Sequence, residues 1–483
     1  MFKYLRQLAG ESLVYGISGT IAKFLQFLLV PLYTRVFLPA DYGVLSLVTT
    51  TMAVVGIFVV LALDNSAARW YWDTEENDDR KRTLASWAWC QLVMSVTLAL
   101  GILIASEWIA QMVIGRADAA IYFRLTAIAL PLSTLSTLVV NWLRMQRRPW
   151  ATMWYALGSS LLTILLTLLF VIGLQMRLTG VYMAQVVTGI VTSISAAFLL
   201  RDWIHPRYFR WARLREMLRF ALPLIPAALA FWIVNLSDRY FVQYFSTTSE
   251  VGLYQFGSSI ASSVALISGA FQQAWGPFAM SIHTQSSARQ VYANVLLAYT
   301  WLMCLFCTTI TLFTPEIVRL LAPVTYTSAG TVVSFLVFSY AFIGLTYIAA
   351  IGLNIIKTNR PTGIAVTLAA GLNILLNLIF VPTMGKVGSA LATLLSQAVV
   401  PIYVFYYAQR HYPIPYRFGT TASLFGLSFL IIGVGNLVSG FEQSSLDVGI
   451  RLFLLFLFVP ILFALRIVTP AQIYKRKTPD MQF

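Results

Sequence analysis

The chain has 483 residues, of which 59% are hydrophobic and only 11% are charged, whereas about a quarter of an ordinary soluble domain is charged. A soluble core cannot bury so many apolar side chains, so the composition excludes an ordinary soluble protein and predicts that lipid surrounds much of the surface. The net charge of +15 does not indicate nucleic-acid binding, because the basic residues fall in short loops between apolar runs. The three cysteines lie in apolar stretches, so neither a disulfide framework, a metal site nor a cofactor is predicted.

The first apolar run covers residues 12–34 and is interrupted only by Lys23. Basic residues precede it, as they precede a secretory signal. The run is too long for the apolar core of a signal, and it lacks an evident cleavage site with small residues. We therefore expect it to be a retained first membrane span.

Apolar runs bounded by charged residues continue along the chain, and about 20 apolar residues cross the hydrocarbon core of a membrane as a helix. The first six predicted spans are 12–34, 41–64, 82–107, 124–144, 148–177 and 177–201. The next six are 220–244, 251–278, 291–314, 331–353, 362–382 and 387–408, and two more follow at 418–438 and 449–465. Arg451 lies inside the last span and is expected to extend to the membrane interface. The sequence thus predicts an all-α integral membrane protein with about 14 transmembrane helices.

The loops predict the orientation of these spans. Most of the 33 lysine and arginine residues lie on one side of the membrane if the N-terminus is placed in the cytoplasm. The densest cluster lies between spans six and seven and contains Arg201, Arg207, Arg210, Arg213, Arg215 and Arg219. Basic residues near the C-terminus fall on the same side. Both termini are therefore expected in the cytoplasm, which requires an even number of spans.

The sequence resembles itself at an offset of about 209 residues. The matching segments are 5–8 with 214–217, 40–43 with 249–252, 148–149 with 360–361, and 180–184 with 388–392. Because the offset spans six helices, both copies have the same orientation. Parallel repeats of this kind predict two bundles related by a pseudo-twofold axis along the membrane normal, with a pathway between them. The expected domains are a six-helix bundle in residues 1–205, a second in 206–410, and two extra helices with a tail in 411–483.

Three segments resemble a known family. They are Pro31-Leu32-Tyr33-Thr34-Arg35 with Leu38-Pro39-Ala40-Asp41-Tyr42-Gly43, then Ala62-Leu63-Asp64-Asn65-Ser66-Ala67-Ala68-Arg69-Trp70-Tyr71, and Ser237-Asp238-Arg239-Tyr240-Phe241 with Ser249-Glu250-Val251-Gly252-Leu253-Tyr254. They resemble the first hairpin, the exit of the second helix, and the seventh helix with its following turn in Wzx-type polysaccharide flippases. These belong to the multidrug/oligosaccharidyl-lipid/polysaccharide exporter superfamily. The resemblance covers most of the chain.

The resemblance implies a function. It implies that the chain flips an undecaprenyl-pyrophosphate-linked oligosaccharide, such as an O-antigen repeat unit, from the cytoplasmic to the periplasmic leaflet by alternating access. It further implies a location in the bacterial inner membrane, and polysaccharide polymerase and glycosyltransferases as partners alongside membrane lipids. A polyprenol tail can stay in lipid, whereas the pyrophosphate needs a polar and preferably cationic route.

Ionisable residues inside spans are costly, so each is a candidate functional residue. Lys23 lies near mid-depth of the first span and is expected to face a central cavity. Arg239 is expected to contact substrate phosphate, with a structural ion pair as the alternative, and simple interfacial roles stay open for Arg35, Arg69 and Asp64. Polar residues such as Gln26 either line a sugar path or join helices. The candidate substrate-binding residues are Lys23, Arg239, Arg35, Arg69, Gln26, Asn235 and Gln272, and the candidates for ion coupling are Asp64 and Asp238.

Two other functions compete with a flippase. The first is a cation-coupled drug or other small-molecule antiporter on the same scaffold, which would be expected to place carboxylates in its cavity. The second is a membrane enzyme that acts on the same lipid intermediates. Such an enzyme needs a sizeable outer loop or a convergent acid–base set, and the predicted outer loops are short. We therefore expect a transporter that is not an enzyme.

Overall fold

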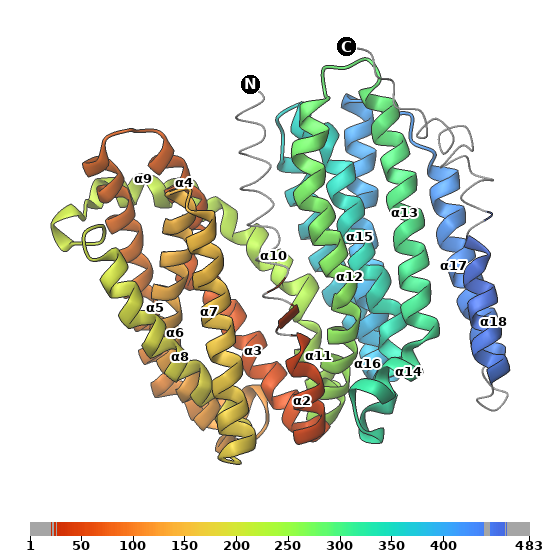
Figure 1. Cartoon of the computed structure of the whole chain (residues 1–483), viewed down its shortest axis with the longest axis horizontal. Coiled ribbons are helices and arrows are strands. Elements are labelled where there is room, and N and C mark those ends of the chain that lie inside the picture. The colour runs from red at the N-terminus through yellow and green to blue at the C-terminus, as the bar shows by residue number, and fades with distance from the viewer. Residues whose placement is uncertain (1–20, 22–23, 26, 439–444, 459, 461–483) are drawn as a thin grey trace, which may run out of the picture. The chain divides into compact units, whose positions relative to one another are not determined.

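The computed structural model describes residues 21, 24–25, 27–438, 445–458 and 460 (Figure 1). Within these residues every regular element is a helix. Eleven helical segments among them are long and apolar enough to cross a membrane. The prediction of an all-α membrane protein is therefore confirmed.

The number of 14 spans stays a prediction. Most of the first predicted span lies outside the described residues, and helix α18 (Ser445–Phe456) covers only the start of the last one. Helix α16 (Arg360–His411) is one continuous segment of 52 residues, but Gly385 has non-helical backbone angles, with φ 54° and ψ −134°. The predicted spans 362–382 and 387–408 lie on either side of this kink.

Contacts divide the chain into two compact units. The first is formed within Met1–Phe256 and Ala370–Ser389, and the second within Gly257–Ala369 and Ala390–Phe483. The first contains α2 (Leu29–Val36), α3 (Pro39–Val60), α4 (Leu63–Trp72), α5 (Asn77–Val113), α6 (Ala120–Met145), α7 (Pro149–Leu168), α8 (Arg177–Leu200), α9 (Trp211–Ala221), α10 (Ile225–Leu236) and α11 (Asp238–Phe245). The second contains α13 (Ala288–Leu312), α14 (Thr314–Leu321), α15 (Gly330–Ile355), α17 (Phe418–Val438) and α18, while α12 (Thr248–Ser281) and α16 contribute to both. The predicted domains 1–205, 206–410 and 411–483 follow the sequence repeat and stay a prediction.

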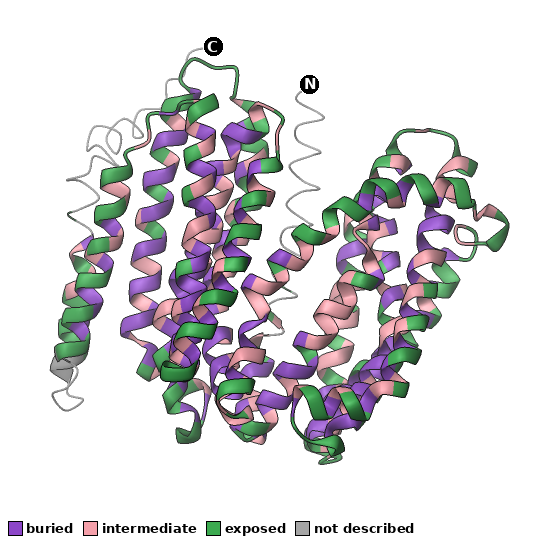
Figure 2. Cartoon of the chain, turned by 180° about the vertical axis from the view of Figure 1, so that it is seen from behind, coloured by how far each residue is buried: buried purple, intermediate pink, exposed green. Residues whose placement is uncertain are grey.

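The first unit has an apolar interior and an apolar exterior. Val44, Leu47 and Phe123 belong to one buried cluster, and Trp87 and Leu143 belong to another. The opposite faces of its helices are exposed (Figure 2). The outer face of α7, for example, exposes 60% of Trp150, 66% of Trp154 and 63% of Leu165. Such surfaces are stable only when lipid covers them.

Arg451 of α18 is buried within the protein, with 4% of the residue exposed. Its Nη1 donates to the carbonyl oxygen of Leu312 at 2.7 Å and to the Glu316 carboxylate at 2.8 Å. The arginine thus has an acidic partner and a helix-terminal carbonyl group, and its position at the membrane interface stays a prediction.

Two glycines bring the first turns of α3 and α12 into contact within the first unit. Gly43 of α3 packs against the carbonyl group of Thr248, and Gly252 of α12 packs against the carbonyl group of Pro39. A Cβ at either glycine would overlap these backbone atoms. Pro39 and Thr248 are the first residues of the two helices. Glycine is therefore required at both positions to let the backbones approach.

The contact joins equivalent positions of the internal repeat. Gly43 and Gly252 correspond to one another in the repeat, and so do Pro39 and Thr248. The hydroxyl of Ser46 donates to Oε1 of Gln255 at 3.0 Å, and these two residues are also equivalent, being 209 positions apart. A two-fold axis brings equivalent residues together across itself. The crossing of α3 and α12 thus has the local two-fold symmetry that a parallel repeat predicts.

The crossing predicts a difference between two glycines of the same helix. Gly252→Ala should destabilise the protein by about 1–3 kcal/mol, because the methyl group has to displace backbone atoms of α3. Gly269→Ala in α12 is the control, since a Cβ at that position meets nothing within 4 Å. Thermal unfolding of the detergent-purified variants checks this. Equal melting temperatures for the two variants would contradict the close contact.

Candidate functional site

Two charged residues of the sequence are buried where α10 gives way to α11. Asp238 is 1% exposed and Arg239 is 4% exposed. Ser237 lies between the two helices, and its hydroxyl donates to the carbonyl oxygen of Ile233 at 2.7 Å. Ser237 and Asn373 of α16 are also within hydrogen-bonding distance, at 3.4 Å. This interruption places two adjacent ionisable side chains inside the first unit.

The Asp238 carboxylate accepts hydrogen bonds from two other helices. The Tyr254 hydroxyl of α12 donates to Oδ2 at 2.6 Å, and Nδ2 of Asn377 in α16 donates to Oδ1 at 3.1 Å, with Nδ2 of Asn373 at 3.5 Å. Oδ1 of Asn377 in turn accepts from the Ser389 hydroxyl at 2.6 Å. A buried carboxylate is stable only with such partners. We call these five residues (Asp238, Tyr254, Asn373, Asn377 and Ser389) the Asp238 cluster.

Arg239 points to a different set of acceptors. Its Nη1 donates to the carbonyl oxygen of Asn235 at 2.6 Å, and its Nη2 donates to Oε1 of Gln255 at 3.1 Å. The guanidinium also lies 5.3 Å from the ring centroid of Tyr254. Because Gln255 Oε1 accepts from Ser46 as well, Arg239 is linked to the crossing of α3 and α12. In this structure the guanidinium is engaged by protein groups, and its role toward substrate phosphate stays a prediction.

Asp64 belongs to a second polar cluster, at a break between α3 and α4. Leu61 and Ala62 have left-handed backbone angles, with φ values of 49° and 54°, which are rare for residues other than glycine. Asp64 accepts from Nε1 of Trp87 at 3.2 Å, Nε2 of Gln91 at 2.9 Å and Nδ2 of Asn141 at 3.3 Å. The same Gln91 amide donates to the carbonyl oxygen of Val60 at 3.3 Å. The Gln91 side chain thereby supplies a hydrogen bond to a carbonyl group at the break, where the regular helical hydrogen bonds are interrupted.

A third polar contact lies beside the kink of α16. Nζ of Lys386 is 2.8 Å from Oε2 of Glu250, in the first turn of α12. The neighbouring Gly385 is the residue with non-helical angles. Both ends of this ion pair belong to the first unit, so the kink is tied to the helix that carries Gly252.

The other candidates do not all gather in one place. Lys23 and Gln26 lie outside the described residues. Arg35 is exposed, and Arg69 is exposed with its guanidinium 5.3 Å from the ring centroid of Phe220. Asn235 is half-buried beside Arg239, whereas Gln272 is exposed and belongs to the second unit. Among the candidates that the structure describes, Asn235, Asp238 and Arg239 are thus brought together, and the functional roles of all nine candidates stay predictions.

Several residues of these clusters were not expected from the sequence. They are Tyr254, Gln255, Asn373, Asn377, Ser389, Gln91, Asn141, Glu250 and Lys386. One signal was present, because Asn373 and Asn377 are four residues apart in an apolar run and therefore lie on the same helix face. Both are fully buried. Their partner Asp238 is far away in the sequence, and no local pattern connects them.

With this geometry established, known proteins can be compared. The sequence model of a family described as polysaccharide biosynthesis protein matches residues 8–283. A relative named succinoglycan biosynthesis transport protein ExoT, from Rhizobium meliloti (strain 1021), is 21% identical over 253 residues, which are 52% of this chain and 48% of that protein. The chain thus spans about half the length of the curated relative that it matches.

Solved structures that are similar to most of this chain include the following two. One is described as lipid II flippase MurJ in an inward closed conformation, with a TM-score of 0.75, 14% identity, and coverage of 94% of this chain and 100% of that one. The other is an inward-facing multidrug resistance MATE family transporter of the MOP superfamily, with a TM-score of 0.64, 16% identity, and coverage of 83% and 95%. At these identities the similarity shows a shared fold.

The Asp238 cluster predicts a specific loss of stability. Tyr254→Phe should cost about 1.5–3 kcal/mol, because it removes a hydrogen bond to a buried carboxylate. Tyr244→Phe is the matched control, since Tyr244 of α11 is 80% exposed. Thermal unfolding in detergent measures both. A Tyr254→Phe variant as stable as the control would show that the carboxylate does not depend on this hydroxyl.

Proposed function

The chain belongs to the polysaccharide biosynthesis protein family, and we propose that it flips a lipid-linked oligosaccharide across a membrane. The proposed substrate is an undecaprenyl-pyrophosphate-linked repeat unit of O-antigen or another surface polysaccharide. It moves from the cytoplasmic to the periplasmic leaflet of a bacterial inner membrane by alternating access, and both termini of the chain are cytoplasmic. The protein moves its substrate without a cofactor and without changing it chemically. The observation that carries this proposal is the family match over residues 8–283 on a multi-pass helical fold.

The comparisons and the chemistry of the substrate support the proposal. A relative is named as a transport protein of succinoglycan biosynthesis, and a protein with the same fold is described as a lipid II flippase. The prenyl tail of such a substrate can remain in lipid, whereas its pyrophosphate needs positive charge along its route. Lys23, Arg239, Arg35 and Arg69 are the proposed sources of that charge. Polysaccharide polymerase and glycosyltransferases of the same pathway are the proposed partners.

The crossing of α3 and α12 supports alternating access. Parallel repeats allow one bundle to move against the other around a local symmetry axis. Gly43 and Gly252 make the backbones touch on such an axis, and Arg239 is connected to it through Gln255. A charge that binds substrate close to this contact can bias whether the contact is closed or open.

A second candidate function is a cation-coupled antiporter for drugs or other small molecules. The shared fold with a multidrug transporter and the presence of two carboxylates inside predicted spans, Asp64 and Asp238, favour it. The two functions differ in the charge of their substrates, because an antiporter for cations needs free carboxylates where a pyrophosphate carrier needs cations. Surface glycan measured in a deletion strain separates them.

Deletion of the gene in its host should abolish surface glycan and leave the lipid-linked intermediate on the cytoplasmic face. Wild type should restore the glycan, whereas Lys23→Ala and Arg239→Ala should lower the rate of flipping on the order of tenfold or more, since a charge-assisted contact contributes about 1.5–3 kcal/mol. Arg201→Ala is the control, because that side chain is 64% exposed. Full rescue by both variants at normal protein levels would remove these residues from the site. Unchanged surface glycan in the deletion strain would refute the flippase and favour the antiporter.

Ion coupling is proposed to depend on Asp238 or Asp64. In proteoliposomes, an inward or outward gradient of protons or sodium ions should accelerate flipping by the wild-type protein. Asp238→Asn should reduce that rate to its value without a gradient, because a neutral amide neither takes up a proton nor attracts a cation. Asp202→Asn is the control, since the Asp202 side chain is 76% exposed. If Asp238→Asn keeps the full response and Asp64→Asn loses it, the coupling site is Asp64.

A further inference from the structure

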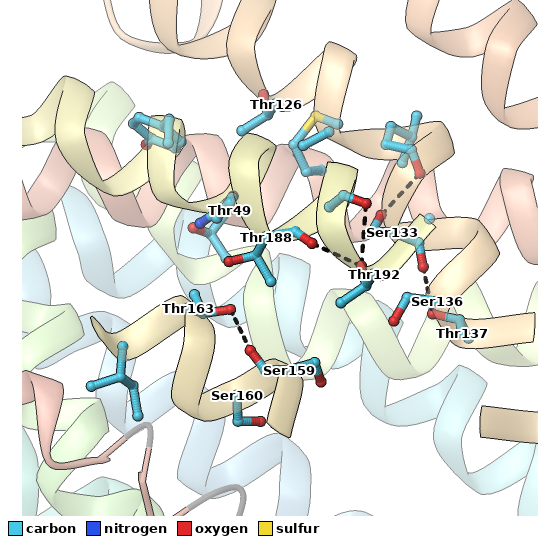
Figure 3. A pocket seen from close by; sticks show the side chains of 18 of the residues that line it. Thr49, Thr126, Ser133, Ser136, Thr137, Ser159, Ser160, Thr163, Thr188 and Thr192 are labelled. Atoms are coloured by element: carbon cyan, nitrogen blue, oxygen red, sulfur yellow. Dashed lines mark hydrogen bonds between the residues drawn. The ribbon is translucent and has the colours of Figure 1, made fainter. Parts of the chain in front are cut away.

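The first unit contains a cavity that neither polar cluster occupies. It has a volume of about 580 Å³ and lies among α3, α6, α7 and α8, and Leu29 of α2 also lines it (Figure 3). Pockets for small ligands commonly have volumes of about 300–1,000 Å³. All of its lining residues belong to the first unit. We call it the hydroxyl pocket, for the side chains described next.

Most of the described residues that line the hydroxyl pocket are of polar but uncharged types. Eleven of the nineteen described residues that line it carry hydroxyl groups, and Gln185 adds an amide. None of these nineteen described residues is acidic, basic or a histidine. Figure 3 shows Ser159 and Thr163 of α7 facing Thr188 and Thr192 of α8 across the cavity. Such a lining suits a neutral polar ligand and offers no counter-charge to an ion.

The hydroxyl groups are arranged mainly as acceptors. Thr163 donates to the carbonyl oxygen of Ser159 at 2.9 Å, Thr137 donates to that of Ser133 at 3.0 Å, and Thr192 donates to that of Thr188 at 2.9 Å. A hydroxyl whose proton is used by its own helix keeps two lone pairs for another partner. The pocket therefore presents a surface of oxygen acceptors to whatever enters it.

Two further hydroxyls in the lining lack any hydrogen-bond partner among the described residues. Tyr182 is 1% exposed and Thr188 is 7% exposed, and neither side-chain oxygen is paired. A buried polar group without a partner costs about 1–3 kcal/mol. Both residues line the cavity, although less than 1 Å² of either oxygen is accessible. A ligand that brings its own donors and acceptors would therefore remove this cost once these side chains turn toward the cavity.

Three classes of occupant can be compared on these grounds. A lipid chain would leave the unpaired hydroxyls unsatisfied, and a phosphate group would find no cation among the described lining residues. A sugar ring carries hydroxyl groups around its edge that both donate and accept, and its C–H faces fit the apolar side chains Met52 and Ile164. The sugar therefore matches the unpaired groups, the acceptor surface and the neutrality of the lining.

We propose that the hydroxyl pocket binds a neutral sugar residue of the transported oligosaccharide. This inference rests on the proposed flippase function and adds a place where the sugar end is recognised. The pyrophosphate is held elsewhere, by cations, so the two ends of the head group are recognised by different chemistry. The pocket distinguishes a lipid that carries sugars from one that carries only pyrophosphate.

Gly56 offers a way to fill the pocket with little disturbance of the fold. It lines the cavity from α3, and a Cβ at this position meets nothing within 4 Å. Gly56→Leu should therefore place its side chain in the cavity without a backbone clash. Gly101→Leu in α5 is the matched control, since a Cβ there also meets nothing and this exposed glycine does not line the pocket. Thr188→Val is a second variant that removes one unpaired hydroxyl and keeps the shape.

The experiment measures binding of two probes to the purified full-length protein. One is the lipid-linked oligosaccharide extracted from the deletion strain, and the other is undecaprenyl pyrophosphate without sugar. Wild type and Gly101→Leu should bind the first more tightly than the second. Gly56→Leu should bind both equally, with the affinity for the sugar-bearing lipid lowered to that for the sugar-free one. Thr188→Val should lower only the affinity for the sugar-bearing lipid, by about 3- to 10-fold, as expected for the loss of one hydrogen bond.

Each other outcome overturns a specific statement. If folded Gly56→Leu and Thr188→Val bind the sugar-bearing lipid like wild type, the pocket does not bind sugar, while the flippase function stands. An equal loss of affinity for both lipids also overturns the proposal, because the pocket then does not recognise the sugar. If wild type binds neither lipid and the deletion strain keeps its surface glycan, the flippase function fails and this inference fails with it.

Discussion

A polar group inside lipid-facing helices has no water to bond, so every interruption of a helix must be satisfied by the protein itself. The break between α3 and α4 persists because Gln91 takes up the carbonyl oxygen of Val60 and joins Asp64 to α5. The junction of α10 and α11 holds Asp238 because α12 and α16 supply donors to its carboxylate. These interruptions place charge at depth, and the same bonds connect helices far apart in the sequence.

At the crossing of α3 and α12, polar groups are again satisfied within the protein, and the residues involved are equivalent in the internal repeat. Contact between the two backbones needs glycine at equivalent positions, and the Ser46–Gln255 hydrogen bond continues it with equivalent side chains. Arg239 shares the Gln255 acceptor, and Lys386 ties the kink of α16 to the same turn of α12 through Glu250. A change at the crossing is therefore transmitted to the charged residues by direct contacts. The proposed alternating access requires a physical coupling of this kind between substrate binding and helix movement.

Charged residues and uncharged polar residues lie in different parts of the first unit. Charged residues lie at the helix interruptions, whereas the cavity among α3, α6, α7 and α8 is lined by hydroxyl groups, with no acidic residue, basic residue or histidine among its described lining. A lipid-linked oligosaccharide has the same division, with an anionic pyrophosphate followed by neutral sugars. Cations bind the first through long-range electrostatics, and hydroxyl groups bind the second through hydrogen bonds at short range.

Hydropathy alone determined that this is an all-α membrane protein, because the length of an apolar run sets whether it crosses lipid. It also singled out Asp238 and Arg239, since a charge in an apolar run is conspicuous, and the segments 40–43 and 249–252 showed the repeat. Only the tertiary structure decided that Asn373 and Asn377 meet Asp238, that Arg451 pairs with Glu316, and that hydroxyls of four helices line one cavity. The reason is that hydropathy reports how deep a residue lies, whereas its partners depend on the rotation and packing of each helix, which distant residues set together.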